Sequence, residues 1–214
     1  MMEGFTLHGS PHSQFTYKVA LMLRLSDRSF AFRYVSFQKG MHRTAQFRAL
    51  SPWGQVPVLQ HDGLVLCQSA AILEYLAETL GTFMPADRRQ KLAVREWLYW
   101  GADRLAPPVY ACYGAALGRR RLLPIETEPA VEADAGRRLE SALTALDAQL
   151  ADRRFAVSDD ATIADVACYG DVCFATLSDI DLRPWANVER WSERIAALPR
   201  FARPFELLAM EDMP

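Results

Sequence analysis

Cysteine is scarce in this sequence, and its few copies are too scattered to hold a metal ion or a disulfide framework. The four cysteines are Cys67, Cys112, Cys168 and Cys173. Their spacings match neither the paired thiols of a zinc site nor the regular pattern of a small secreted scaffold. We therefore expect free thiols in a reducing, cytoplasmic environment, and no metal cofactor.

Long apolar runs and an excess of charge of one sign are also missing. No stretch of about 18 consecutive apolar residues occurs, and no apolar N-terminal run with a basic flank and a small-residue cleavage site. The 24 Lys and Arg residues nearly balance the 26 Asp and Glu residues, for a net charge of −2. This balance offers no electrostatic attraction to nucleic acid or to an anionic membrane. We expect a soluble cytoplasmic protein with neither as a partner.

The segment 51–76, SPWGQVPVLQHDGLVLCQSAAILEYL, carries the most informative pattern. A short apolar strand, Pro57–Gln60, is followed by the Asp62-Gly63 pair and by a second strand, Leu64–Cys67. Asp-Gly readily supplies the positive φ angles of a tight hairpin turn. A helical pattern, Ala70–Glu78, follows. The segment therefore predicts a hairpin that leads directly into a helix.

Two positions in this segment could bind a peptide-like ligand. Proline interrupts a sheet, so Pro57 belongs at the start of its strand, where its peptide bond could be cis. A cis Val56-Pro57 bond would turn the N–H and C=O groups of Val56 away from the sheet. Ser69 at the start of the next helix would offer a hydroxyl, backbone N–H groups and the positive end of the helix dipole to a carboxylate.

The remaining periodicity predicts an α/β domain followed by an all-helical one. The first part reads β-α-β-α-β-β-α, and a linker with Pro85 precedes a part without convincing strands. The further elements expected before the linker are strands at Phe5–His8 and Ala31–Phe37 and helices at Phe15–Leu25 and Thr44–Leu50. After it, helices are expected at about Arg88–Leu117, Thr127–Leu150, Thr162–Leu177, Asn187–Ala197 and Phe201–Ala209.

The Val-Pro strand, the Asp-Gly turn and the Gln68-Ser69 helix start together resemble the cytosolic glutathione S-transferase family, of the bacterial, serine-type kind. The resemblance covers nearly the whole chain. It implies a thioredoxin-like glutathione-binding domain at 1–80, a linker at 81–88 and a helical-bundle domain at 89–214. It also implies glutathione as co-substrate, a homodimer and a role in detoxification. Thr162-Ile163-Ala164-Asp165 matches the capping box that begins a helix in this family.

The resemblance assigns glutathione contacts to residues of the hairpin segment. Val56, ahead of Pro57, would pair with the cysteinyl unit through its backbone, and Gln68 and Ser69 would bind the γ-glutamyl end. Gln55 and Lys39 are expected near the glycine end. Competing interpretations are an ordinary helix cap for Gln68-Ser69 and a solvated surface charge for Lys39.

The loop after the first strand, Ser10-Pro11-His12-Ser13, would lie beside the thiol. Redox relatives of this fold place a Cys-Pro-x-Cys motif here, and serine cannot form a disulfide, so dithiol redox chemistry is not expected at this loop. A serine hydroxyl can instead donate a hydrogen bond to a thiolate, aided by the N-terminus of the next helix. Alignment on the helix favours Ser13, and alignment on the proline favours Ser10. The alternative for Ser13 is a role as the helix cap only, and His12 is expected to be exposed.

The helical domain would supply the pocket for an electrophile. Trp100, Arg104 and Tyr110 are its candidate residues, although an aromatic stripe at helical spacing is also typical of a core or an interface. Pro107-Pro108 should kink or interrupt this helix.

The predicted activity is glutathione transfer to a small hydrophobic electrophile. The alternatives are a glutathione-dependent isomerase, reductase or dehalogenase, or a non-catalytic protein of the same fold that binds a ligand or a partner.

Overall fold

In the computed structural model, which describes residues 4–208, strands occupy only the N-terminal part of the chain. The described residues divide into two units. Unit 1 contains residues 4–81 and 198–208, and unit 2 contains residues 82–197. The predicted combination of a thioredoxin-like part and a helical part is confirmed. No helix in the described range is long and apolar enough to cross a bilayer.

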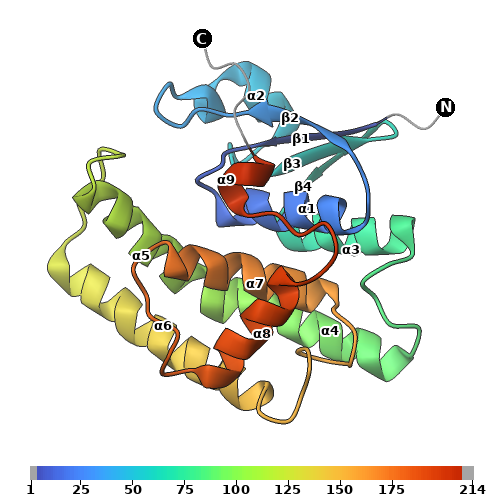
Figure 1. Ribbon diagram of the computed structural model, residues 1–214. Coiled ribbons are helices and arrows are strands. Elements are labelled where there is room, and N and C mark those ends of the chain that lie inside the picture. Colours follow the sequence, from blue (N-terminus) through green and yellow to red (C-terminus); the bar gives the residue numbers. More distant parts are fainter. Residues whose placement is uncertain (1–3, 209–214) are drawn as a thin grey trace. The chain divides into compact units, whose positions relative to one another are not determined.

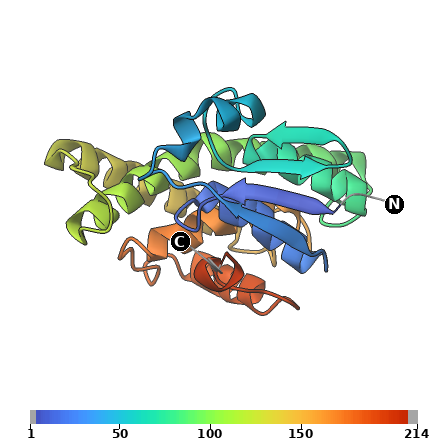
Figure 2. The ribbon, with the colours of Figure 1, turned by 90° about the horizontal axis from the view of Figure 1, so that it is seen from above.

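Unit 1 is built on a four-stranded mixed sheet, seen from above in Figure 2. Its strands are β1 (Phe5–Gly9), β2 (Phe30–Tyr34), β3 (Val58–His61) and β4 (Leu64–Cys67), in the order β2-β1-β3-β4. β1 is parallel to β2 and antiparallel to β3, and β3 is antiparallel to β4. β2 ends at Tyr34, earlier than the expected Phe37.

The helices of unit 1 cover both faces of this sheet. They are α1 (Gln14–Leu25), the 3₁₀ turn η1 (Met41–Arg43), α2 (Ala45–Leu50), α3 (Ser69–Leu80) and α9 (Pro204–Leu207). Figure 1 shows α1 and α3 on one face and α2 on the other. Phe47 of α2 packs with Val35 and Val58 against the sheet. Most of α1 is buried, because apolar side chains occur all round it.

The predicted hairpin between β3 and β4 is confirmed. Asp62 and Gly63 both have positive φ, 47° and 74°, which is the backbone of the tight two-residue turn that Asp-Gly favours. The turn pairs His61 with Leu64 and Val58 with Cys67. The hairpin register is therefore the one that the Asp-Gly pair predicts.

The C-terminal segment returns to unit 1. The Tyr17 hydroxyl of α1 donates to the carbonyl of Ala202 at 2.9 Å, and Arg200 forms an ion pair with Asp27, with Nε and Oδ1 2.7 Å apart. This grouping differs from the expected helical domain over 89–214. The helix expected over Phe201–Ala209 is shorter, Pro204–Leu207, and Ala209 lies outside the described residues.

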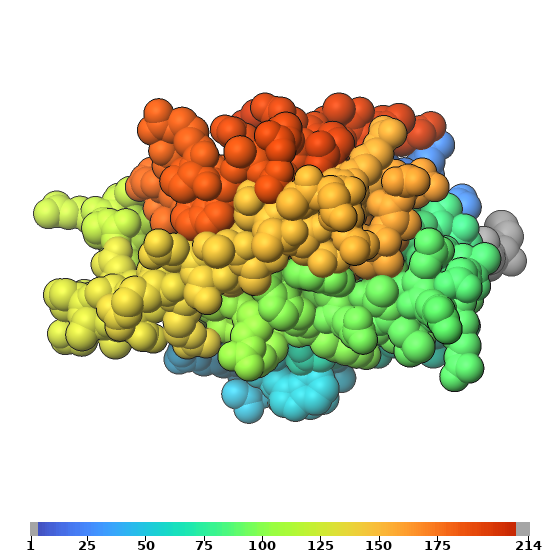
Figure 3. Space-filling view, turned by 90° about the horizontal axis from the view of Figure 1, so that it is seen from below, coloured from blue at the N-terminus to red at the C-terminus, as the bar shows by residue number. Residues whose placement is uncertain are grey.

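Unit 2 consists of helices, several of which reach the surface seen in Figure 3, with α4 in green, α6 in yellow and α8 in orange. α7 packs against α4, α5 and α8, and α6 packs against α5 and α8. The helices are α4 (Arg88–Trp100), the π-helical η2 (Gly101–Leu105), α5 (Ala106–Arg119), α6 (Pro129–Gln149), α7 (Ile163–Thr176) and α8 (Ala186–Ala196).

The break in the long helix expected over Arg88–Leu117 lies ahead of the two prolines. The π-helical turn η2 separates α4 from α5, and Pro107 and Pro108 fall in the first turn of α5. Proline is tolerated there, because first-turn N–H groups have no acceptor within the helix. The expected interruption of the helix is therefore present, in the turn directly ahead of the prolines.

The capping box at the start of α7 is present, and the carboxylate of its Asp165 accepts hydrogen bonds from several parts of unit 2. Asp165 is fully buried. Its Oδ2 accepts from the N–H of Thr162 at 2.9 Å and from the Thr162 hydroxyl at 2.8 Å. Its Oδ1 accepts from the N–H of Ala156 at 2.8 Å and from the indole of Trp191 at 2.9 Å. Burial raises the pKa of Asp165, while these hydrogen bonds act in the opposite direction.

The variant Asp165→Asn should reduce the free energy of unfolding by about 3 kcal/mol, because an amide nitrogen would face groups that themselves donate. Asp159→Asn, at an exposed carboxylate in the preceding loop, is the control and should change little. Urea denaturation followed by circular dichroism measures both. Equal stability of the two variants would show that the Asp165 carboxylate does not hold α7 and α8 together.

Candidate functional site

The candidate glutathione-binding residues lie at one end of the sheet in unit 1. The register pairs Gly9 with Tyr34, His8 with Val58 and Val58 with Cys67. The ends of β1, β2 and β4 and the start of β3 therefore meet at the same edge. From this edge extend the serine loop, the Lys39 turn, the Val56-Pro57 segment and the start of α3. Residues far apart in sequence are thereby brought together.

The serine loop between β1 and α1 is a closed network of hydrogen bonds. The Ser13 N–H donates to the Ser10 carbonyl at 3.0 Å, and the His12 N–H donates to the Ser10 hydroxyl oxygen at 3.3 Å. The Ser10 N–H donates to Thr16 Oγ1 at 3.3 Å. Gly9 has no room for a side chain, because a Cβ there would lie 2.2 Å from the Thr16 methyl carbon. These contacts hold both serines close to the first turn of α1.

Ser13 is the N-cap of α1. It has extended backbone angles, φ −112° and ψ 111°, and its Oγ accepts from the N–H of Thr16 at 3.2 Å. This confirms the structural role expected for Ser13. The bond uses a lone pair of the oxygen and leaves the hydroxyl hydrogen to donate elsewhere, because a serine hydroxyl is one donor and two acceptors. Capping and donation to a ligand are therefore compatible.

His12 is not the exposed loop residue expected from the sequence. It is half-buried, and its ring packs edge-on against Phe205, with ring centroids 5.4 Å apart. Burial lowers the pKa of His12, which favours the neutral imidazole. The cause of the difference is a partner from the C-terminal segment, which no local pattern around His12 reveals.

The backbone of Val56 is available at the start of β3. The Val56-Pro57 peptide bond is cis, as predicted. The preceding turn is held by Ser51, whose hydroxyl donates to the Gln55 carbonyl at 2.9 Å and accepts from the Gln55 N–H at 3.0 Å. Val56 itself is half-buried and takes part in no hydrogen bond with the described residues. Its N–H and C=O groups are thus suited to pair with an extended ligand.

Gln68 is hydrogen-bonded to Gln55, the other glutamine predicted to contact glutathione, and its backbone dihedral angles are unusual. Its φ is 70° and its ψ 112°, outside the regions that non-glycine residues usually occupy. Such angles cost about 1–3 kcal/mol and are typical of functional sites. The Gln68 amide donates to Gln55 Oε1 at 3.3 Å. Ser69, half-buried, is the first residue of α3, which exposes N–H groups at this point.

The segment from Arg28 to His61 is positively charged, and its connection between β2 and β3 begins at the same end of the sheet. Between Arg28 and His61 the sequence has no acidic residue. Its five cationic side chains are exposed and form no ion pair within residues 4–208. Burial, together with the charges of Arg43 and Arg48, lowers the pKa of His42. Lys39 is the only one of these cations predicted as a glutathione contact, although the absence of acidic residues from 28–61 can be read directly from the sequence. The cations are Arg28, Arg33, Lys39, Arg43 and Arg48.

The candidate electrophile residues lie in unit 2. Trp100 is half-buried and packs against Trp97 with ring centroids 4.7 Å apart. Arg104 is exposed and forms an ion pair with Asp103 at 2.9 Å. Tyr110 is 68% exposed. The π-helical turn η2, a feature frequent at functional sites, contains Arg104 and lies between the two aromatic residues.

All four cysteines are free thiols.

Comparison with known proteins agrees with this architecture. Family models of the glutathione S-transferase N-terminal and C-terminal domains match residues 12–79 and 106–199. Glutathione S-transferase PARB of Nicotiana tabacum is 26% identical over 210 residues, which cover 94% of this chain and 97% of the relative. Disulfide-bond oxidoreductase YfcG of Escherichia coli (strain K12) is 28% identical over 191 residues, 86% of each chain.

The solved structures give the same result. A glutathione S-transferase from Xanthobacter autotrophicus Py2 is 30% identical, with a TM-score of 0.84 over 93% of this chain and 96% of that one. The two domain models match in order along the chain, and this likeness spans both. The protein therefore belongs to the glutathione S-transferase family, whose members carry out glutathione-dependent transfer or oxidoreductase chemistry.

Proposed function

We propose that the protein is a glutathione transferase that binds glutathione at the sheet edge of unit 1 and activates its thiol for attack on a small hydrophobic electrophile. One observation carries the proposal. The register of the sheet brings a capped serine loop, an unpaired backbone edge at Val56 and the start of α3 to the same edge. A scaffold protein has no need of this combination.

Each part of the tripeptide has a counterpart at this edge. The Val56 backbone pairs with the cysteinyl unit. The γ-glutamyl carboxylate lies at the start of α3, where Ser69 and Gln68 and the helix dipole stabilise negative charge. The glycine carboxylate lies toward Gln55 and Lys39, where the acid-free stretch 28–61 favours an anion.

Ser13 is the proposed thiol-activating residue. Its oxygen accepts from the Thr16 N–H, and its hydrogen would donate to the glutathione sulfur. Once the thiol proton has left to solvent, this donor and the α1 dipole stabilise the thiolate. A charge-assisted hydrogen bond is worth roughly 1.5–3 kcal/mol, and one pKa unit corresponds to about 1.4 kcal/mol. One serine is therefore sufficient to depress the thiol pKa by at least one unit.

The transfer step would end in the helical unit, where Trp100, Arg104 and Tyr110 are the proposed contacts of the electrophile. Glutathione-dependent disulfide reduction is the second candidate function, because an oxidoreductase is 28% identical to this chain. Substrate assays separate the two. Transfer consumes one glutathione per electrophile and forms a thioether, whereas reduction consumes two per disulfide and releases oxidised glutathione. Detoxification in the cytoplasm is the role that we associate with the transfer activity.

Glutathione should stabilise the native protein. At a concentration a hundredfold above its dissociation constant, a ligand specific for the native state adds about 2.7 kcal/mol. We expect a higher melting temperature in glutathione, and a smaller rise for Ser69→Ala, which loses a carboxylate contact. Ser141→Ala, at an exposed serine of α6, should respond as the unaltered protein does. No shift at millimolar glutathione in ligand-free protein would argue for a non-catalytic scaffold.

The two loop serines should differ in their effect on bound glutathione. Ser13→Ala should raise the thiol pKa, read from the pH dependence of thiolate absorbance, and leave the affinity nearly unchanged. It should also reduce the free energy of unfolding by about 1 kcal/mol, the usual value of an N-cap. Ser13→Thr should preserve both, and exposed Ser29→Ala is the stability control. A raised thiol pKa in Ser10→Ala alone would transfer the role to Ser10.

We also propose that the protein is a homodimer, paired through the exposed side of α4. Leu92 is 50% and Tyr99 57% exposed on this helix, and two-fold pairing is the commonest symmetry of soluble oligomers. Sedimentation at micromolar concentration should give twice the chain mass of 24.1 kDa. Tyr99→Ser should weaken pairing, whereas Val131→Ser on α6 should not. A species of the single-chain mass would refute the dimer.

A further inference from the structure

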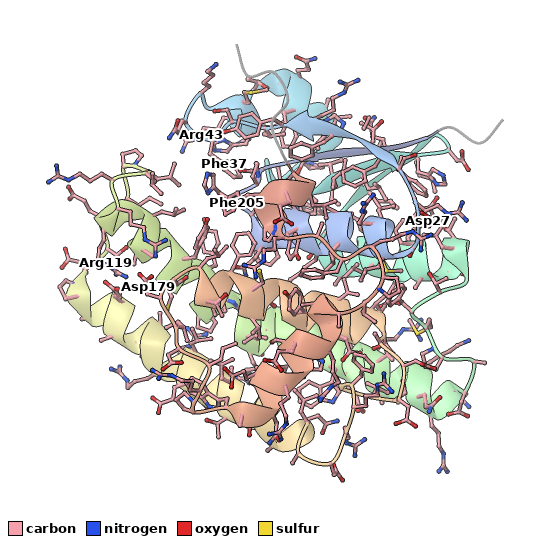
Figure 4. The ribbon with its side chains drawn as sticks, in the orientation of Figure 1. Asp27, Phe37, Arg43, Arg119, Asp179 and Phe205 are labelled. Carbon is pink, nitrogen blue, oxygen red and sulfur yellow. The ribbon has the colours of Figure 1, made fainter. Side chains whose placement is uncertain are left out.

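The C-terminal segment 198–208 is attached to unit 1 at both ends of α1. Beyond the C-terminus of α1, Arg200 contacts both carboxylate oxygens of Asp27, at 2.7 and 2.9 Å. Along α1, the fully buried Tyr17 donates to the Ala202 carbonyl at 2.9 Å. At the N-terminal end, Phe205 packs on His12. In Figure 4, Asp27 and Phe205 lie at opposite ends of α1. The segment thus spans the whole helix.

The contact between Phe205 and His12 lies in the loop that carries the proposed thiol-activating serine. His12 lies between Ser10 and Ser13, and its N–H donates to the Ser10 hydroxyl oxygen. The turn is closed by the bond from the Ser13 N–H to the Ser10 carbonyl. The position of the His12 ring is therefore coupled to the turn that places both serines. Phe205 packs on this ring while remaining 45% exposed itself.

Phe205 is partly exposed and lies in the short helix α9. This helix has four residues; its first residue, Pro204, is buried, and its C-cap, Leu208, is 1% exposed, so side chains other than Phe205 also anchor the segment. The ring of Phe205 contacts His12. This ring contact restricts the orientation of His12 and, through it, of the loop.

We infer that Phe205 is a positioning residue for the thiol-activating loop, so that the C-terminal segment holds Ser13 in the geometry that stabilises the glutathione thiolate. This inference rests on the proposed function. It assigns part of the thiol activation to a residue that does not touch the sulfur. Asp27 and Arg200 act at the other end of α1 as the attachment that keeps the segment, and hence Phe205, in place.

The test compares Phe205→Ala with Phe205→Tyr in the full chain. Phe205→Ala should raise the thiol pKa of bound glutathione by about half a unit, which lowers the ratio of thiolate to thiol about threefold. Phe205→Tyr keeps the ring and should leave the thiol pKa unchanged. Arg200→Gln should raise it in the same direction but by less. Val131→Ala, which removes an exposed apolar side chain of α6, is the matched control.

A second measurement does not require glutathione. In ligand-free protein, Phe205→Ala should raise the His12 pKa toward its ordinary value, because removing the ring exposes an imidazole whose pKa burial lowers. Proton NMR of the histidine rings reports this titration, and His12→Gln identifies the His12 signal among the four histidines.

The outcomes separate this inference from the proposed function. If the unaltered protein binds no glutathione, both fail, whatever His12 does. If it binds, and Phe205→Ala moves the His12 pKa but not the thiol pKa, the contact is structural only and the inference is overturned. An unchanged His12 pKa also overturns it. A loss of stability alone, with both pKa values unchanged, assigns Phe205 to folding.

Discussion

The N-terminus of α1 imposes the constraint on which unit 1 depends. This helix is buried along most of its length, packing against β1, α3 and the C-terminal segment. Its first-turn N–H groups therefore need acceptors within the protein. Ser13 provides one, and Thr16 Oγ1 accepts from the Ser10 N–H, so the loop and the helix start form one structure. Any chemistry at this loop uses groups already committed to holding the helix.

Strand direction explains why the site lies where it does. β1 and β2 end at the same edge because they are parallel, and β3 begins there because it is antiparallel to β1. The Asp62-Gly63 turn then returns the chain, so that Cys67 and the start of α3 reach the edge again. Four connections converge without any long loop, and the acid-free stretch 28–61 supplies two of them. The fold thus gathers backbone donors and positive charge at the end of the sheet where the proposed glutathione site lies.

Local features of the site could be predicted from the sequence, and long-range ones could not. The Asp62-Gly63 turn and the capping box at Thr162 follow from chemistry within a few residues, and both are present. The strained backbone of Gln68 has no signature, because glutamine is not a residue that favours positive φ. The environment of His12 depends on Phe205, near the other end of the chain. The adjacent prolines predict a kink or an interruption of the long helix, but not that it takes the form of the π-helical turn η2.

Because the C-terminal segment packs on unit 1, unit 1 can be completed only after the whole described chain has been synthesised. Domains generally fold from the N-terminus as the ribosome releases them, but Ala202 and Phe205 emerge only after all of unit 2. Until then the hydroxyl of Tyr17 lacks the carbonyl that it contacts in the finished fold, 185 residues later in the sequence. Unit 1 can therefore begin to fold first and yet be completed last. A nascent chain stalled before Arg200 would carry the serine loop without the segment that packs on it.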